Sequence, residues 1–248
     1  MDRGVMKRLG TLAASLVLAL AMVATTGAPA QAALDLRAPL TREPVSRGAV
    51  DRDPYAISHV YEIQIRLQRM GLLKASPNGT FGPATERAVR LLQKRLGQRQ
   101  TGRVNAALWP HLIRKSLRGQ AATPKACTSP GWHLCYDRAR HQATLYANGR
   151  LYNSWLVRGG GYGTQTRTGS FTVQWRSKDH YSRQFGGAPM PYSQFFSGGQ
   201  ALHGSRLMMN PYEGHSHGCV NFWVEDARQL WNLTHDKRLN VHVYGAWD

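Results

Sequence analysis

The spacing of apolar residues changes near residue 131, and this change constrains the fold more than any other feature of the sequence. Between residues 58 and 114, apolar side chains recur at intervals of three and four, the period of an amphipathic helix. From about Trp132, short runs rich in β-branched and aromatic residues replace this period. A chain of 248 residues can form a small and a medium domain, each with its own core. We therefore expect a small all-α domain followed by a mainly β domain.

Three helices are expected between residues 58 and 114. The apolar positions of the first are Val60, Ile63, Leu67 and Met70, and those of the second are Ala88, Val89, Leu92 and Leu96. Gly71 and Gly97 follow these stretches, and glycine is favoured just beyond the end of a helix. A short apolar piece at residues 108–113 supplies the third helix.

Short β-rich runs and one helix are expected from residue 132 onward. The runs are residues 133–136, 142–147, 151–157, 170–175 and 240–244. Asn148-Gly149, between the second and third runs, is a strong hairpin signal because both residues tolerate positive φ. Residues 224–233 have helical spacing. The second domain is therefore predicted to be mainly β, with one helix.

Residues 1–32 have the organisation of a secretory signal peptide. Arg3, Lys7 and Arg8 precede an uncharged stretch, and small residues lead to Ala30-Gln31-Ala32. The strongly apolar part is shorter than the ~20 residues that a membrane-spanning helix needs. We expect export across the cytoplasmic membrane and cleavage after Ala32, with an uncleaved membrane anchor as the alternative.

Two segments are predicted to be linkers. Residues 33–57 carry three prolines among Arg and Asp residues and have no sustained apolar period, so we expect a flexible tether. Residues 115–130 are basic and contain Ala and Pro. The predicted order is therefore a signal peptide, a linker, a helical domain over residues 58–114, a second linker, and a β domain over residues 131–246.

The chain is strongly basic, with 32 Lys and Arg against 14 Asp and Glu and a net charge of +18. Such a balance indicates an anionic partner, which in general is nucleic acid, an acidic membrane surface or another polyanion. Export argues against nucleic acid. We therefore expect anionic polymers of the cell envelope.

Three cysteines are an odd number for an exported protein. Cys127 and Cys135 lie eight residues apart around a turn-rich loop and are candidates for a small disulfide ring. Cys219 would then be the free thiol. An idle free thiol in an oxidising compartment is prone to oxidation, so its presence indicates chemistry.

Reactive side chains gather around Cys219. His203-Gly204 lies upstream, and Ser216-His217-Gly218-Cys219-Val220-Asn221 surrounds the thiol. A thiol with a pKa of about 8.5 is mostly protonated at neutral pH and needs a base to become a nucleophile. A histidine within hydrogen-bond reach can take this proton and return it to a leaving amine. His203 and His217 both qualify, and spacing alone does not choose between them.

A zinc site is the main chemical alternative. His203, His215, His217 and Cys219 are all residue types that bind zinc. However, no Cys-x-x-Cys or His-Glu-x-x-His motif accompanies them. We therefore expect no metal and no other cofactor.

Residues 58–114 resemble the small peptidoglycan-binding domain found beside many cell-wall enzymes. The matching features are Ile65-Arg66-Leu67-Gln68 before Gly71-Leu72, Asn78-Gly79-Thr80-Phe81-Gly82, Thr85 with Ala88-Val89 and Gln93, and Thr101-Gly102 with Leu108-Trp109. The resemblance implies peptidoglycan as a partner. A structural three-helix spacer would show the same apolar pattern and is the alternative.

Residues 131–246 resemble the L,D-transpeptidases of the YkuD family. The family signature is His-Gly, a variable stretch, and then Ser/Thr-His-Gly-Cys-hydrophobic-Asn/Arg, which His203-Gly204 and residues 216–221 match. Residues 166–171 are similar to a second family element, with Arg167 in place of a proline. The resemblance implies a YkuD-type β-sandwich with one helix as the catalytic domain.

The resemblance also assigns roles. It implies Cys219 as nucleophile and His203 as general base, with the Gly204 carbonyl orienting the imidazole. The other motif residues, expected to shape the turn and the oxyanion pocket, are Ser216, His217, Gly218 and Asn221. Residues 176–200 are expected to form a lid, with an ordinary surface loop as the alternative. The candidate substrate-binding residues of this lid are Tyr192, Phe195 and Phe196.

The implied reaction begins with attack of Cys219 on the amide between the third residue of a tetrapeptide stem and its terminal D-Ala. D-Ala leaves, and the side-chain amine of a diamino acid on a second stem resolves the thioester as a 3→3 cross-link. The same site using water would be an L,D-carboxypeptidase, and one using a protein amine would attach proteins to the wall. The resemblance further implies acylation by carbapenems. A non-catalytic wall-binding protein with a vestigial thiol is the alternative from another class.

Overall fold

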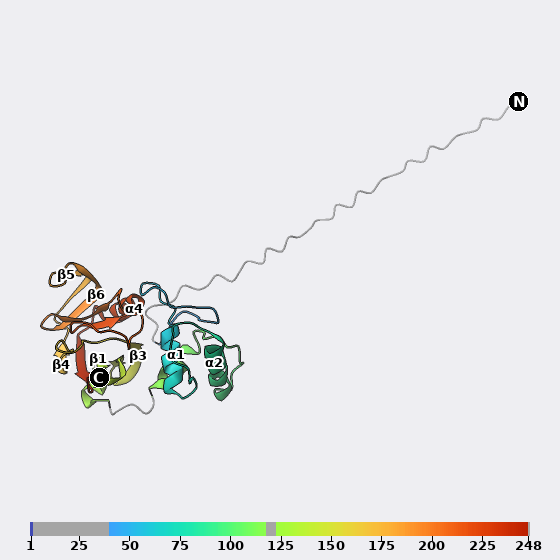
Figure 1. The fold of residues 1–248 in the computed structure, drawn as a ribbon, viewed down its shortest axis with the longest axis horizontal. Helices are drawn as coiled ribbons and strands as arrows, with labels where there is room; N and C mark the ends of the chain where they lie inside the picture. The colour runs from blue at the N-terminus through green and yellow to red at the C-terminus, as the bar shows by residue number, and fades with distance from the viewer. Residues whose placement is uncertain (2–39, 118–122, 248) are drawn as a thin grey trace. The chain divides into compact units, whose positions relative to one another are not determined.

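Three helices occupy the region of helical spacing (Figure 1). They are α1 (Val60–Arg69), α2 (Pro83–Arg95) and α3 (Trp109–Ser116). Val60, Ile63 and Leu67 are fully buried and share a core with apolar residues of the other two helices. The helices end just before Gly71 and Gly97, as their spacing predicts. The predicted three-helix region is confirmed.

The computed structural model describes Met1 and residues 40–117 and 123–247. Residues 2–32 of the predicted signal peptide lie outside the described residues, as do residues 33–39 and 118–122 of the two predicted linkers. The helices and strands of the described residues all belong to one unit of the chain. None of the helices within the described ranges combines the length and the apolar character that crossing a membrane requires.

Two sheets build the β domain, in the orders β3-β2-β1-β9-β4 and β5-β6-β7-β8. The strands are β1 (Trp132–Asp137), β2 (Gln142–Ala147), β3 (Arg150–Leu156), β4 (Gly169–Thr172), β5 (Trp175–Ser182), β6 (Ala188–Ser197), β7 (Gln200–Gly204), β8 (Val220–Phe222) and β9 (Leu239–Tyr244). Short 3-10 turns, η1 (Lys125–Thr128) and η2 (Arg138–Arg140), flank β1, and α4 (Val224–Thr234) precedes β9. β1 pairs with β9 and β7 with β8 in parallel, and the other neighbours are antiparallel.

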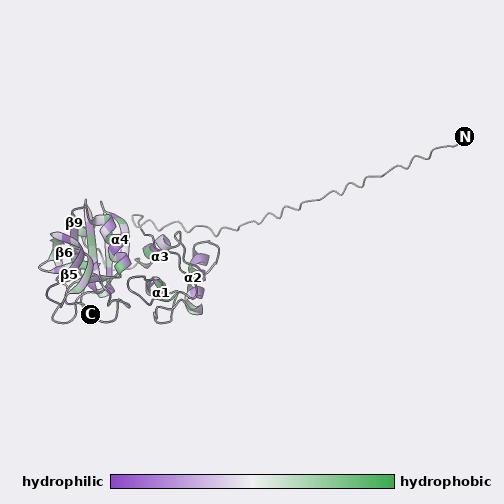
Figure 2. Ribbon diagram, turned by 90° about the horizontal axis from the view of Figure 1, so that it is seen from above, coloured by the Kyte–Doolittle hydropathy of each residue, from purple (hydrophilic) through white to green (hydrophobic). Residues whose placement is uncertain are grey.

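One hydrophobic core joins both sheets and α4. It contains Leu134 and Val241 from the first sheet, Leu202 and Val220 from the second, and Leu230 from α4. The Trp155 ring of β3 packs edge-on against Phe222 of β8, with ring centroids 6.0 Å apart. α4 packs against β6 and β7, and Figure 2 shows it beside the strands. The predicted mainly β domain with one helix is confirmed as two layers around a shared interior.

Most of the four-stranded sheet was not predicted from the sequence. Residues 170–175, expected as one strand, divide between β4 and β5, which belong to different sheets. β5 and β6 form a hairpin over most of residues 176–200, the segment expected to be a lid. Most side chains of β5 are exposed or partly exposed, so this strand lacks an apolar period. The Asn148-Gly149 hairpin is confirmed, because β2 ends at Ala147 and β3 begins at Arg150.

The described part of the first predicted linker, residues 40–57, is packed rather than loose. Leu40 and Val45 are buried in the core of the helical domain. Val45 also pairs with Val104 through two backbone hydrogen bonds of 2.8 Å. The expectation of a flexible tether is therefore corrected for these residues. The few apolar side chains were too widely spaced to reveal a period, but each has a partner far along the chain.

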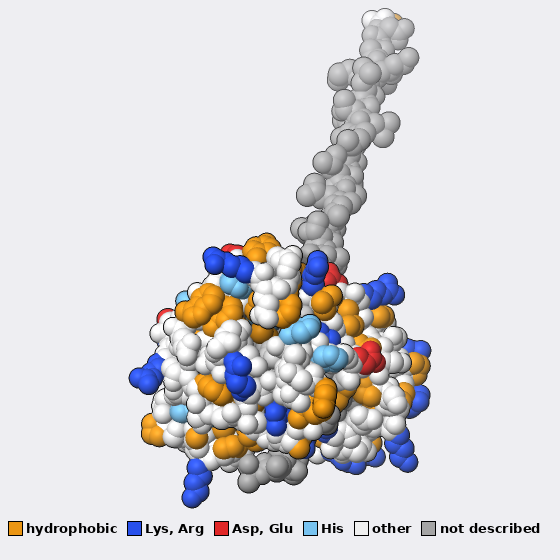
Figure 3. All heavy atoms as spheres, turned by 60° about the vertical axis from the view of Figure 1, so that its left-hand side comes forward, with side chains coloured by type: hydrophobic (Ala, Val, Ile, Leu, Met, Phe, Trp, Pro, Cys, Tyr) orange, Lys and Arg blue, Asp and Glu red, His pale blue; other side chains and the backbone are white. Residues whose placement is uncertain are grey.

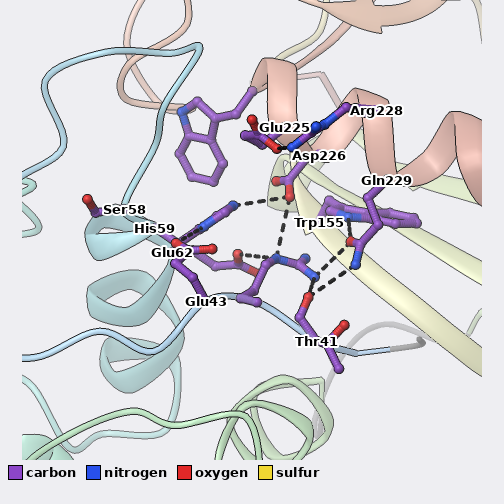
Figure 4. Close-up of polar contacts among 12 residues, drawn as sticks. Thr41, Glu43, Ser58, His59, Glu62, Trp155, Glu225, Asp226, Arg228 and Gln229 are labelled. Carbon is purple, nitrogen blue, oxygen red and sulfur yellow. Dashed lines mark hydrogen bonds and ion pairs between the residues drawn. The ribbon is translucent and has the colours of Figure 1, made fainter. Parts of the chain in front are cut away.

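A buried cluster of charges connects this segment, α1 and α4 (Figure 4). Arg42 contacts Glu62 at 3.2 Å and Asp226 at 3.4 Å, and Arg66 contacts Glu62 at 2.7 Å. The two ring nitrogens of His59 face carboxylates, Glu43 at 2.6 Å and Asp226 at 3.1 Å. Figure 4 shows His59 and Asp226 pointing toward each other. The Arg42 and Arg66 guanidiniums also donate to the Ser154 carbonyl of β3, so the cluster fixes α1 against the β domain.

The charges of the cluster depend on one another. Burial alone would raise the pKa of Glu62, but Arg42 and Arg66 lower it to about 2. Burial would lower the pKa of His59, but Glu43 and Asp226 raise it well above its ordinary value. The stabilisation from Glu62 is therefore complete above pH 4.5 and lost as pH falls toward 2. That from His59 is complete below pH 6.5 and lost as pH rises through its elevated pKa.

Replacing Glu62 with Gln should destabilise the fold by about 3–5 kcal/mol, because two buried guanidiniums would lose their shared carboxylate. Chemical denaturation followed by circular dichroism measures this difference. Glu86→Gln is the matched control, since Glu86 pairs with Arg90 at the surface. We expect this variant to unfold at the same denaturant concentration as wild type. Equal stabilities of the two variants would contradict a structural role for the cluster.

Candidate active site

A cavity of about 790 Å³ opens on the four-stranded sheet, and Cys219 and His203 both line it. Ser216, His217 and Asn221 of the predicted motif line it as well. The hairpin formed by β5 and β6 supplies much of the remaining wall. Figure 3 shows one face of the molecule, where histidine side chains lie among hydrophobic ones and many Lys and Arg side chains lie toward the margin. The sequence motif is thus gathered around one cavity.

The register of three neighbouring segments places the polar side chains. In the parallel pair of β7 and β8, His203 lies opposite Asn221. On the other side of β8, Arg158 pairs with Asn221 in an antiparallel bridge. Leu202 and Val220, the preceding pair, face the core. Because side chains alternate along a strand, His203, Asn221 and Arg158 form a row on the opposite face, and Cys219 shares that face two residues before Asn221.

The hydrogen bonds of His203 fix its tautomer. Nδ1 lies 2.8 Å from the Gly204 carbonyl, which can only accept, so Nδ1 carries the proton. Nε2 then accepts from the Asn221 side-chain amide at 2.9 Å. Burial lowers the pKa of His203 to about 4, and the charges of His180 and Arg158 act in the same direction. His203 is therefore neutral at physiological pH, with an unprotonated Nε2 whose electron pair accepts from Asn221.

Cys219 is the one cysteine outside a disulfide. Cys127 of η1 and Cys135 of β1 are joined, with the sulfurs 2.09 Å apart. Burial raises the pKa of the Cys219 thiol, and the Ala201 backbone opposes this in part. The thiol lies 4.0 Å from the Gly199 carbonyl and has no hydrogen bond to His203 in this structure. The resting pair is therefore a neutral thiol and a neutral imidazole, with Nε2 occupied by Asn221.

Ser216 organises the turn before Cys219. Its hydroxyl accepts from the Gly218 N–H at 3.0 Å and donates to the Cys219 carbonyl at 2.6 Å. Gly218 has a φ of 115°, which side-chain-bearing residues rarely adopt. A Cβ on Gly160 would lie 2.8 Å from the Gly218 backbone. Glycine is required at position 160 because a Cβ there would meet the Gly218 backbone, and at position 218 because of the positive φ.

The first part of the glycine tract at residues 159–163 is held against the motif by backbone hydrogen bonds. Gly159 accepts from the Ser216 N–H at 2.8 Å, and the Gly161 N–H donates to the Ser216 carbonyl at 3.1 Å. Gly159, Gly160 and Gly161 are buried. These three residues therefore form one side of a short backbone pairing with the motif.

Aromatic side chains form the outer wall. Trp175 and Phe195 stack with centroids 3.8 Å apart, and His180 packs edge-on against Phe195 at 5.0 Å. His217 is exposed and packs against Phe185 at the hairpin tip, with centroids 4.6 Å apart. These contacts give the wall an apolar surface next to the thiol.

Only one of the three predicted lid aromatics reaches the cavity. Phe195 lines it, whereas the neighbouring Phe196 is buried in the core because adjacent strand residues face opposite sides. Tyr192 packs on the core near Trp231, with ring centroids 6.3 Å apart. The expected contact with substrate is therefore corrected for Tyr192 and Phe196.

The residues of the zinc alternative do not gather their ligand atoms. Within the described ranges, only His59, Glu62 and Asp226 bring three such atoms within 4.8 Å of one another. Arg42 already pairs with both carboxylates of that group. The geometry of His203, His215, His217 and Cys219 therefore gives the zinc alternative no support.

Sequence reasoning missed Arg158, Trp175 and Phe185 as residues of the cavity. Arg158 is one of 32 basic residues and belongs to no recognised motif, so its type gave no signal. Only the bridge to Asn221 reveals its position. Trp175 and Phe185 are distant from the motif in the sequence. They lie beside it only because β5 and β6 pair as a hairpin.

Family models match both domains. The L,D-transpeptidase catalytic domain (YkuD) matches residues 131–243, and a peptidoglycan binding domain matches residues 58–112. No curated protein matches the chain. The peptidoglycan-binding domain implies an interaction with peptidoglycan, and a cell-wall-acting family implies a location outside the cytoplasm.

Solved structures of L,D-transpeptidases are similar. One from Stackebrandtia nassauensis is 22% identical, with a TM-score of 0.50, over 84% of this chain and 98% of that one. One from Xylanimonas cellulosilytica is 24% identical, with a TM-score of 0.48, over 82% and 98%. At 22% identity, the similarity to the Stackebrandtia nassauensis structure shows the fold alone. The two family matches show that the chain joins an amino-terminal peptidoglycan-binding domain to a catalytic domain of the L,D-transpeptidase (YkuD) family.

Proposed function

We propose that this protein forms 3→3 peptidoglycan cross-links through a thioester on Cys219, with His203 as general base and release of D-Ala. The observation that carries the proposal is the shared cavity of a free thiol and a histidine whose unprotonated Nε2 is fixed by the Gly204 carbonyl. Both residues belong to the family signature, and the catalytic family model spans them.

In the first step, Cys219 Sγ attacks the carbonyl of the third stem residue while His203 Nε2 takes the thiol proton. The C–N bond to the terminal D-Ala then breaks, and His203 returns the proton to the leaving nitrogen. The Asn221 amide must release Nε2 as the proton arrives, since it occupies that nitrogen at rest. The Gly218 N–H is already donated to Ser216, so stabilisation of the oxyanion falls to other amides, that of Cys219 first.

In the second step, a side-chain amine of another stem attacks the thioester. Its proton passes through His203 to the departing Cys219 thiolate, which regenerates the thiol and leaves one new amide bond. The aromatic wall of Trp175, Phe195 and Phe185 supports an amine over water as the acceptor, because with a stem bound these apolar side chains would exclude solvent from the thioester. Water as acceptor would give an L,D-carboxypeptidase, and a protein amine would give wall attachment.

Export and retention at the wall complete the proposal. Residues 1–32 would direct the protein across the membrane, and the helical domain would hold it on peptidoglycan. Arg87, Lys94 and Arg95 are exposed on α2, where they can contact anionic polymers of the envelope.

Replacing Cys219 with Ser should abolish thioester formation and cross-linking, because a hydroxyl beside a neutral histidine of low pKa is a much weaker nucleophile. The assay incubates the enzyme with a disaccharide tetrapeptide and weighs the products. A dimer lacking one D-Ala indicates transpeptidation, and a tripeptide indicates hydrolysis.

The control for this variant is binding to sacculi, which should be retained because the helical domain is unchanged. Intact mass after treatment with a carbapenem should show one adduct on wild type and none on Cys219→Ser. Cross-linking by the variant at the wild-type rate would overturn the assignment.

The rate of acylation should depend on pH through His203. Its pKa of about 4 means that kcat/KM rises as pH passes 4 and is level through neutral pH, because the base must be unprotonated. An ordinary histidine would place this rise near 6.5. Initial rates of D-Ala release between pH 3.5 and 8 measure the profile, with circular dichroism to confirm folding at the acid end. A rise centred near 6.5 would contradict the described environment of His203.

A further inference from the structure

Arg158 is a buried cation without a counter-ion in the wall of the cavity. It is 7% exposed, and no carboxylate of the described residues forms an ion pair with it. Nη1 donates to the Glu213 carbonyl at 2.9 Å, Nη2 lies 3.5 Å from Asn221 Oδ1, and Nε has no hydrogen-bond partner. By contrast, the buried Arg42 and Arg66 share Glu62. Burying an unpaired charge is costly, so an anionic ligand would relieve Arg158.

The position of Arg158 indicates which part of a ligand it meets. It stands in one row with Asn221 and His203, on three adjacent segments of backbone. Neighbouring strands lie ~4.8 Å apart, so the backbones of Arg158 and His203 are separated by ~10 Å. A ligand that reaches both residues therefore has a nitrogen beside His203 and an anionic group a few ångströms away, beside Arg158.

No acidic side chain in the cavity neutralises the charge of Arg158. None of the side chains that line it is acidic. Arg183 and Arg206 also line it, but both are exposed and therefore hydrated. Among the residues that line the cavity, Arg158 is thus the buried positive charge.

We infer that Arg158 binds the α-carboxylate of the D-amino acid unit whose nitrogen leaves or attacks at His203. The inference rests on the proposed function and names the substrate class for it. In the donor, this carboxylate is that of the terminal D-Ala, one carbon from the nitrogen of the bond that breaks. Arg158 is accordingly a specificity residue for stems that end at D-Ala.

The same contact serves the second step. When Cys219 is acylated, D-Ala departs with its carboxylate, and Arg158 again lacks a counter-ion. An acceptor amine that bears a carboxylate on the adjacent carbon can then occupy the place of D-Ala and attack along the reverse path. We therefore assign the acceptor to stems with a diamino dicarboxylic acid whose side-chain amine has such a carboxylate, in preference to stems with lysine.

The test compares two donors, a disaccharide tetrapeptide ending in D-Ala and the same compound ending in D-alaninamide. Wild type should release D-Ala about 10- to 150-fold faster, in kcat/KM, than it releases D-alaninamide, the range expected for a charged hydrogen bond. Arg158→Gln should lose this factor for the acid and keep the rate for the amide, so that the ratio falls to about 1. Arg158→Lys should restore part of the ratio, because it keeps the charge but not the planar fork.

Two comparisons separate recognition from damage. Arg206→Gln removes an exposed cation of the same cavity and should keep the acid-to-amide ratio of wild type. Distortion of Asn221 by the Arg158 variant would slow both donors equally and leave the ratio unchanged. An Arg158→Gln enzyme with the wild-type ratio would overturn the inference.

The acceptor arm uses wild-type enzyme with three acceptor stems: the free diamino dicarboxylic acid, its amide at the carboxylate beside the amine, and lysine. Wild type should form the most dimer with the free diamino dicarboxylic acid, and the Arg158→Gln variant should no longer prefer this acceptor. Equal use of all three by wild type would also overturn the inference. Absence of any Cys219 thioester in wild type would instead refute the proposed function, so the two failures are distinguishable.

Discussion

The parallel pairing of β7 with β8 sets the positions of the polar groups in the cavity. Leu202 and Val220 lie opposite each other in this pair, and both are in the core. Because side chains alternate along a strand, His203 and Asn221 must lie on the other face. A slip of β7 by one residue would bury the His203 imidazole and expose Leu202. The hydrophobic interior of the sandwich therefore holds the chemistry in register, although none of its residues touches the cavity.

Much of the fold was accessible from the sequence because its signals were local. Each of these signals depends on near neighbours along the chain. They are the helical spacing that ends at a glycine, the Asn148-Gly149 turn and the helical run at residues 224–233. The candidate nucleophile and base were also accessible, since a thiol left unpaired and a family signature single out Cys219 and His203. Their neutral resting state was not, because it results from burial and from the Gly204 and Asn221 contacts.

What the sequence could not predict depends on contacts between distant segments. β5 has no apolar period, since the hairpin is stabilised by pairing and by the Trp175–Phe195 stack. Arg42 looked like one of many charges in a linker, yet it is buried between Glu62 and Asp226. Arg158 likewise becomes informative only when Asn221 lies beside it.

The contact between Gly160 and Gly218 has a consequence for how this enzyme can diversify. Gly160 lies directly against the backbone of Gly218 in the turn before Cys219, so a side chain at position 160 cannot be added without displacing that turn. The wall opposite is a hairpin whose tip, residues 183–187, is exposed and carries varied side chains. Natural variation in substrate preference should therefore accumulate at this tip, while Gly160 and Gly218 are retained.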